Sequence, residues 1–142
     1  MDSKEKERKA LNQLLQGEQM AVETFNIFIS KVKDNETKKI FQEVQKQHRK
    51  NIFRLADYIQ NLGGQPDENI GLKGIMADYK LNNQLNDKDN LYIIEKAIEG
   101  ETKGINMAEK VLRGKLDDKS RKLAGDILHQ DRMSLSKLQS LI

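Results

Sequence analysis

Residues 63–87 read GGQPDENIGLKGIMADYKLNNQLND, and this stretch separates two long amphipathic segments on either side. It opens on two glycines followed closely by a proline, a combination that ends a helix. A connection of this length without structure of its own is uncommon in a compact domain. We therefore expect it to pack on the domain, with a short helix at about 72–80, through the apolar residues Ile70, Leu72, Ile75, Met76, Tyr79 and Leu81.

Helical periodicity dominates the sequence on both sides, because apolar residues recur at steps of three and four and strand-like alternation is absent. The pattern predicts helices over about residues 4–33, 35–62, 88–113 and 117–142. Short turns join the helices within each pair, whereas the pairs are joined by the long segment 63–87. A simple up-down-up-down bundle needs only a few residues at that point. The predicted fold is therefore all-α: one domain over 1–142, with two antiparallel helical hairpins joined by a long crossover.

Composition narrows the class of protein further. The chain has 142 residues, of which 37% are hydrophobic and 33% are charged, and its net charge is +3. The absence of cysteine excludes disulfides, thiolate metal sites, iron–sulfur clusters and cysteine nucleophiles. Lysine and arginine are interleaved with acidic residues, which is typical of a solvated helical surface and predicts no nucleic-acid partner. Without a signal-peptide pattern or an apolar run of roughly 18 residues, we expect no membrane partner and a cytoplasmic location.

Polar residues interrupt the apolar stripes in a repeated arrangement. Glu18 follows Gly17 in the first helix, and Glu101 follows Gly100 in the third; the two histidines, His48 and His129, lie in the second and fourth. With a rise of about 1.5 Å per residue, all four polar residues lie near the middle of the bundle. We expect them to meet there, together with two residues that lie three positions before the histidines, Gln45 and Asp126.

This set of side chains suits a metal ion. Carboxylates within an apolar stripe are costly unless they are paired or bound to a cation. Carboxylate and imidazole together favour iron, manganese or zinc, and helical bundles build such sites from inward-facing Glu and Glu-x-x-His positions. The alternative is a pair of buried Glu–His hydrogen bonds, Glu18 with His48 and Glu101 with His129, which needs no metal.

At these residues the sequence resembles the ferritin-like superfamily of diiron-carboxylate proteins, and it is most similar to the small, single-domain, rubrerythrin-like bacterial members. The resemblance extends from Leu11 to Leu138. It implies two iron ions in a four-helix bundle. Carried over by position, Glu18 and Glu101 become terminal carboxylates, His48 and His129 become imidazole ligands, and Gln45 and Asp126 stand where the family has bridging carboxylates.

The sequence departs from the family pattern at the last two positions. Gln45 is neutral and Asp126 is one methylene shorter than glutamate, so the predicted site offers three carboxylates to two divalent ions. We therefore expect weaker binding, with one metal ion in place of two as the limiting case. The lack of cysteine also excludes the rubredoxin-type iron centre of full-length rubrerythrins.

The resemblance implies a metal-binding protein with iron as the cofactor, and with manganese or zinc as substitutes. As a diiron-type oxidoreductase it would have ferroxidase or peroxide-reducing activity, with oxygen or peroxide as the partner of the metal. The alternative is a non-enzymatic helical bundle with a degenerate metal site, acting as a structural or partner-binding module. Because ferritin-like hairpins often pair, the resemblance also implies a homodimer.

Overall fold

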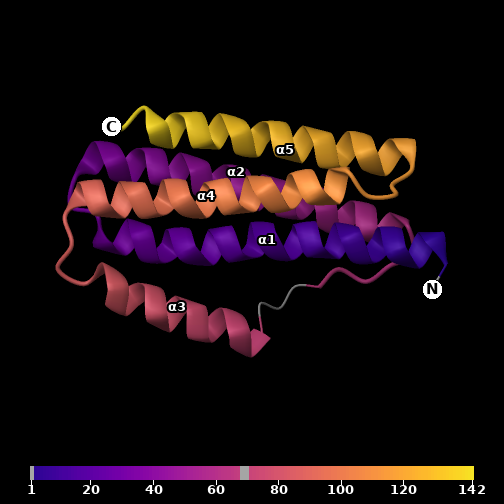
Figure 1. Cartoon of the computed structure of the whole chain (residues 1–142), viewed down its shortest axis with the longest axis horizontal. Coiled ribbons are helices and arrows are strands. Elements are labelled where there is room, and N and C mark those ends of the chain that lie inside the picture. The colour runs from indigo at the N-terminus through magenta and orange to yellow at the C-terminus, as the bar shows by residue number, and fades with distance from the viewer. Residues whose placement is uncertain (1, 68–70) are drawn as a thin grey trace.

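The computed structural model describes residues 2–67 and 71–142, which form five helices and, within these ranges, no strand. The helices are α1 (Ser3–Lys31), α2 (Asn35–Asn61), α3 (Gly71–Leu85), α4 (Asn90–Leu112) and α5 (Asp118–Gln139). Figure 1 shows a bundle of the four long helices, with α3 lying along the outside of α1. After α2 the chain returns along the bundle before α4 begins, so α2 and α4 run in the same direction. The predicted all-α bundle of two hairpins joined by a crossover is confirmed.

An aspartate side chain caps the N-terminus of each of the four long helices. Asp2, Asp34, Asp89 and Asp117 accept hydrogen bonds from the backbone N–H groups of Glu5, Thr37, Tyr92 and Ser120, respectively. Each carboxylate satisfies one of the unpaired N–H groups of a helix end and places negative charge at the positive end of the helix dipole. These caps explain why the long helices begin within two residues of the bounds predicted from sequence.

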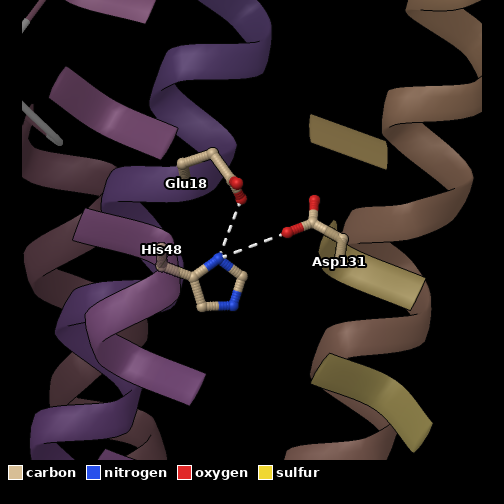
Figure 2. Close-up of side chains that lie close together, drawn as sticks. All are labelled: Glu18, His48 and Asp131. Atoms are coloured by element: carbon tan, nitrogen blue, oxygen red, sulfur yellow. Dashed lines mark hydrogen bonds and ion pairs between the residues drawn. The ribbon is translucent and has the colours of Figure 1, made fainter. Parts of the chain in front are cut away.

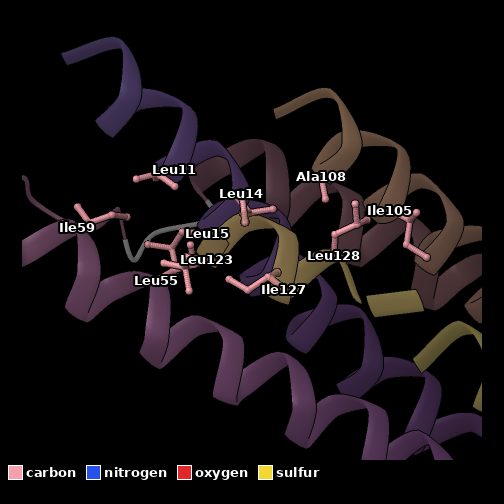
Figure 3. Close-up of a cluster of buried hydrophobic side chains, with 11 residues drawn as sticks. Leu11, Leu14, Leu15, Leu55, Ile59, Ile105, Ala108, Leu123, Ile127 and Leu128 are labelled. Atoms are coloured by element: carbon pink, nitrogen blue, oxygen red, sulfur yellow. The ribbon is translucent and has the colours of Figure 1, made fainter. Parts of the chain in front are cut away.

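The interior consists of two apolar clusters separated by a polar layer. The first cluster, which Figure 3 draws, lies towards the end of the bundle that holds the N-terminus of α1. It contains Leu11, Leu14, Leu15, Leu55, Ile59, Ile105, Ala108, Leu123, Ala124, Ile127 and Leu128. The second lies towards the other end and contains Phe25, Ile27, Phe28, Val32, Phe41, Val44, Leu85, Ile93, Ile94, Ala97 and Leu138. On every long helix, a short stretch lies between the residues of the first cluster and those of the second. Most of the buried polar residues lie in these stretches, whereas Thr37 and Ser120 lie at the starts of α2 and α5.

Helix α3 differs from the expectation for residues 63–87. It is longer than the predicted helix at about 72–80 and packs against α1. Its Leu85 is buried, but Ile75, Met76 and Tyr79 are 61%, 64% and 72% exposed. The prediction that these three side chains pack on the domain is wrong, because a helix lying on the outside of the bundle buries only one of its faces. Ile70 and the side chain of Leu72 lie outside the residues that the structure describes.

Within the described residues, no helix combines the length and the apolar character that crossing a membrane requires.

Candidate metal centre

The polar layer of the bundle is built from all four long helices. Helix α1 contributes Glu18, α2 contributes His48 and Asn51, α4 contributes Glu101, and α5 contributes Asp131. None of these residues is more than 4% exposed. Because apolar clusters cover the layer on both sides, its charged groups are shielded from water and interact strongly with one another.

The imidazole of His48 is the centre of the layer (Figure 2). Its Nδ1 lies 3.0 Å from Glu18 Oε2 and 3.5 Å from Asp131 Oδ1, as the dashed lines mark. Its Nε2 lies 2.9 Å from Glu101 Oε2 on the opposite edge of the ring. Asn51 joins the two carboxylates on the Nδ1 side, since its Nδ2 donates to both Glu18 Oε1 and Asp131 Oδ1. One ring therefore connects carboxylates from three other helices.

Burial and neighbouring charges shift two pKa values in this layer. Burial alone lowers the pKa of His48, but the carboxylates of Glu18 and Glu101 outweigh it and raise this pKa well above its usual value. Burial and the nearby Glu18 raise the pKa of Asp131 to about 9, despite the opposing effect of His48. At neutral pH the metal-free layer therefore holds a histidinium ion between two glutamates, together with a neutral Asp131.

Three of the six residues predicted to form the site come together. Glu18, His48 and Glu101 lie within hydrogen-bond distance through the imidazole. Gln45 is buried as well, but its amide is held at the contact of α1 with α2. There its Nε2 donates to the carbonyl oxygen of Val22 at 2.9 Å and to Asn26 Oδ1 at 2.7 Å.

The other two predicted residues, Asp126 and His129, do not reach the centre of the bundle. Asp126 forms ion pairs with Arg54 at 3.2 Å and Lys122 at 3.4 Å on the surface, and His129 is exposed. The prediction that they converge with Glu18 is therefore wrong. Asp131, two residues beyond His129, occupies the central position instead. Two residues correspond to about 200° around a helix, so when Asp131 points inward His129 must point outward.

A constant spacing in the sequence would have identified Asp131. Glu18 and Glu101 are 83 residues apart, whereas the two histidines are 81 apart. Several buried or capping residues pair at the spacing of 83: Asp34 with Asp117, Thr37 with Ser120, His48 with Asp131, and Asn51 with Ser134. The two histidines are 81 residues apart, so treating them as equivalent positions places the second half two residues out of this register.

Comparison with known proteins supports the ferritin-like fold. Over 99% of its length the chain superimposes, with a TM-score of 0.82 and 25% identity, on a two-domain protein from Anabaena variabilis that contains DJ-1/ThiJ/PfpI-like and ferritin-like domains. The chain spans 40% of the length of that protein. A dodecameric thioferritin, the bacterioferritin-related protein from Bacteroides fragilis, matches with a TM-score of 0.75 and 18% identity, over 99% of this chain and 85% of its own.

No curated protein matches the sequence significantly. A family model, described as a domain of unknown function (DUF2383), matches residues 6–114, which include most of α1 and all of α2 and α4, with Glu18, His48 and Glu101. The match covers well over half of the chain, and the chain therefore belongs to the DUF2383 family.

Proposed function

We propose that this protein is a ferritin-like metal-binding protein, and that Glu18, His48 and Asp131 hold a divalent transition-metal ion, natively iron. The observation that carries the proposal is the convergence of three donor atoms from three helices. His48 Nδ1, one oxygen of Glu18 and one oxygen of Asp131 all lie within 4.8 Å of one another in a buried layer. The structural neighbours support the ferritin-like superfamily, and the rubrerythrin-like subtype stays a prediction from sequence.

The two separations from His48 Nδ1 fit a metal ion. A first-row divalent ion binds nitrogen and oxygen at about 2.0–2.2 Å, so adjacent donors on one ion lie roughly 3.0–3.5 Å apart. The separations of His48 Nδ1 from Glu18 Oε2 and from Asp131 Oδ1 are 3.0 and 3.5 Å. One imidazole with two carboxylates is a donor set that suits iron, manganese and zinc.

Glu101 prepares His48 for this role. A neutral imidazole carries one N–H and one lone pair, and Glu101 Oε2 lies 2.9 Å from Nε2, where it accepts the N–H. The lone pair is then on Nδ1, which faces Glu18 and Asp131. Metal-bound histidines usually donate their second ring N–H to a carboxylate or carbonyl in this way, which orients the ring and increases its basicity.

Iron held at these residues would supply one-electron chemistry towards oxygen or peroxide, which is the basis of the ferroxidase or peroxide-reducing activity that we propose. The chain contributes the environment. Glu18 and Asp131 balance the charge of the cation, and His48 and Asp131 each give up a proton when it binds. Because apolar side chains lie on both sides of the layer, water is kept from these groups.

A second candidate function follows from the same contacts. Both ring nitrogens of His48 are paired with carboxylates, so the layer satisfies its polar groups without an ion. The bundle would then be a structural or partner-binding module, as the alternative interpretation of the sequence holds. For either function we propose a homodimer as the smallest assembly, which light scattering on the purified chain tests directly.

Metal titration of the purified protein distinguishes the two functions. The protein is stripped with EDTA and dialysed against Mn²⁺, Zn²⁺ or, without oxygen, Fe²⁺, and bound metal and melting temperature are measured. An ion that binds only the native state must raise its stability, by about 2.7 kcal/mol at a free concentration of 100 times Kd. We expect bound metal and a higher melting temperature. A chain that retains no metal above background would contradict metal binding and favour the structural module.

The chain offers matched controls for this experiment. His48→Gln and Asp131→Asn remove a ligand, whereas His129→Gln and Asp126→Asn make the same changes on the surface of α5. We expect the first pair to abolish binding and the second pair to bind like the wild type. Loss of metal binding in His129→Gln would place the metal away from the polar layer and contradict the proposed ligand set.

A further inference from the structure

Two positions decide how many ions the polar layer can hold. In the dinuclear pattern of helical bundles, a glutamate lies three residues before the histidine ligand on each of two helices. Three residues before His48 is Gln45, and three residues before Asp131 is Leu128. Once the structure places Asp131 in the layer, both positions that would supply a carboxylate shared between two ions are occupied by neutral side chains.

Neither neutral side chain is available to an ion in the layer. Leu128 is 3% exposed and belongs to the first apolar cluster, together with Ile105 and Ala108. The amide of Gln45 is bonded to Val22 and Asn26 at the α1–α2 contact. A second ion would therefore meet hydrocarbon at Leu128, next to the first cluster, or an amide that is already paired at Gln45, next to Val44 of the second cluster. A buried cation without ligands is strongly disfavoured.

The remaining donors also serve a single ion. A neutral imidazole has one lone pair, so His48 can bind one ion, on its Nδ1 side. On its Nε2 side the one carboxylate in contact, among the residues that the structure describes, is Glu101 at 2.9 Å, which accepts the ring N–H. The second histidine of the dinuclear pattern is replaced by Asp131, whose Oδ1 lies on the same side as Nδ1. In Figure 2 the donors of Glu18 and Asp131 converge on this one nitrogen.

We infer that the centre is mononuclear: one divalent ion per chain, bound by Glu18, His48 Nδ1 and Asp131, with Glu101 as a positioning residue. Gln45 and Leu128 are the residues that set the stoichiometry at one. This inference rests on the proposed function, because it presumes that the layer binds metal. The inference goes beyond the proposed function because it distinguishes this chain from the diiron proteins that the sequence resembles.

The stoichiometry is measured on the full chain with Mn²⁺ and Zn²⁺ as probes. Stripped protein is dialysed to saturation, and bound metal per chain is determined by mass spectrometry of the intact protein and by elemental analysis. We expect one ion per chain. Two ions would overturn the mononuclear centre but leave the proposed function standing, whereas no ion would overturn the proposed function itself.

A gain-of-function variant makes the role of the two neutral positions testable. The double variant Gln45→Glu, Leu128→Glu restores a carboxylate three residues before His48 and before Asp131, and we expect it to bind two ions per chain. The matched control, Gln42→Glu with Met133→Glu, adds the same two charges at exposed positions of α2 and α5 and is expected to bind one. A folded double variant that still binds one ion would refute the role assigned to Gln45 and Leu128.

Spectroscopy of the wild type keeps the inference testable if a buried glutamate at position 128 prevents folding. Mn²⁺ in a mononuclear site gives the electron paramagnetic resonance spectrum of an isolated ion, which grows in proportion to bound metal up to one ion per chain. Two ions in one site are exchange-coupled and give a different, many-line spectrum. The appearance of the coupled spectrum in the wild type would overturn the mononuclear assignment.

Discussion

Replacement of Asp131 by asparagine is expected to stabilise the metal-free protein and, at the same time, to abolish metal binding. Burial and Glu18 raise the pKa of Asp131 to about 9 from an ordinary value of 3.8. At pH 7 this carboxyl is ionised in the unfolded chain and protonated in the folded one, so folding must take up a proton. Each unit by which pH 7 exceeds the ordinary pKa of 3.8 costs about 1.4 kcal/mol. The destabilisation at pH 7 therefore has an upper limit of about 4 kcal/mol.

Asparagine removes this cost with little change in shape. Its carbonyl oxygen can accept from Asn51 Nδ2, as Asp131 Oδ1 does at 3.3 Å. Its amide can donate towards Glu18, as a protonated carboxyl would, and it needs no proton from solvent. The variant, however, offers a metal a weaker, neutral ligand in place of a carboxylate. A buried group that costs stability and is useful only when an ion is bound is typical of a functional site.

The pH dependence of the effect has a definite sign. Since the pKa of Asp131 is raised on folding, the folded state binds more protons than the unfolded state between about pH 4 and pH 9. The stability of the wild type therefore falls, relative to the variant, as pH rises through this range. The raised pKa of His48 acts in the same direction: its stabilisation is complete below about 6.5 and is lost as pH rises through its folded value. Because both proteins contain His48, the difference between them mainly reports Asp131.

Urea unfolding in EDTA at pH 5, 7 and 8.5, followed by circular dichroism, measures this difference. We expect Asp131→Asn to exceed the wild type in free energy of unfolding at pH 7 and to gain further at pH 8.5. Asp126→Asn is the control, because Arg54 and Lys122 lower the pKa of the exposed Asp126 and its removal should give no gain. An Asp131→Asn protein less stable than the wild type at pH 7, or a difference that does not grow with pH, would refute the reasoning.

Three further outcomes follow from the same structure. Metal binding should displace protons from His48 and Asp131, so the apparent affinity for Mn²⁺ should rise by up to about a hundredfold per pH unit near neutrality. Calorimetry in buffers of different ionisation enthalpy would show this proton release, and equal heats of binding in all buffers would disprove it. Glu101→Gln should weaken Mn²⁺ binding by about 10–100-fold while keeping the stoichiometry of the wild type, measured by equilibrium dialysis, and an unchanged affinity would remove its positioning role. Asp34→Ala removes the cap that bonds Thr37 N at 3.1 Å and should lower the free energy of unfolding by about 1 kcal/mol, with Asp34→Asn as the conservative control that restores most of it.

The bundle itself could be predicted from the sequence because its signals are local. The three- and four-residue spacing of apolar side chains predicts each long helix, and the aspartates at 34 and 117 mark two of the helix starts. The length of residues 63–87 indicates a crossover, because a simple up-down-up-down bundle needs only a few residues at that point. The burial of α3 was not predictable in the same way, because Ile75, Met76 and Tyr79 lie on the face of α3 that has no neighbour among the described helices.

The candidate centre was predictable in part. Glu18, His48 and Glu101 interrupt strong apolar stripes, so the helical period alone places them in the interior, and the structure brings them together. In α5 the helical period does not identify the inward-facing polar residue, because polar residues lie on several faces of this helix. A difference of two positions, from Asp131 to His129, rotates the side chain by about 200° and exchanges a central ligand for a surface residue.

Helical spacing and the repeated Gly-Glu pairs were thus enough to specify four helices, their hairpin order and an acidic, imidazole-containing interior, since each of these depends on neighbours along the chain. The rotation of α5 about its own axis depends instead on how Leu123, Ile127 and Leu138 pack against the other helices. That packing turned Asp131 inward and left Leu128 in an apolar cluster. The identity of the fourth central residue, and with it the number of ions that we infer, followed from contacts between residues far apart in the chain.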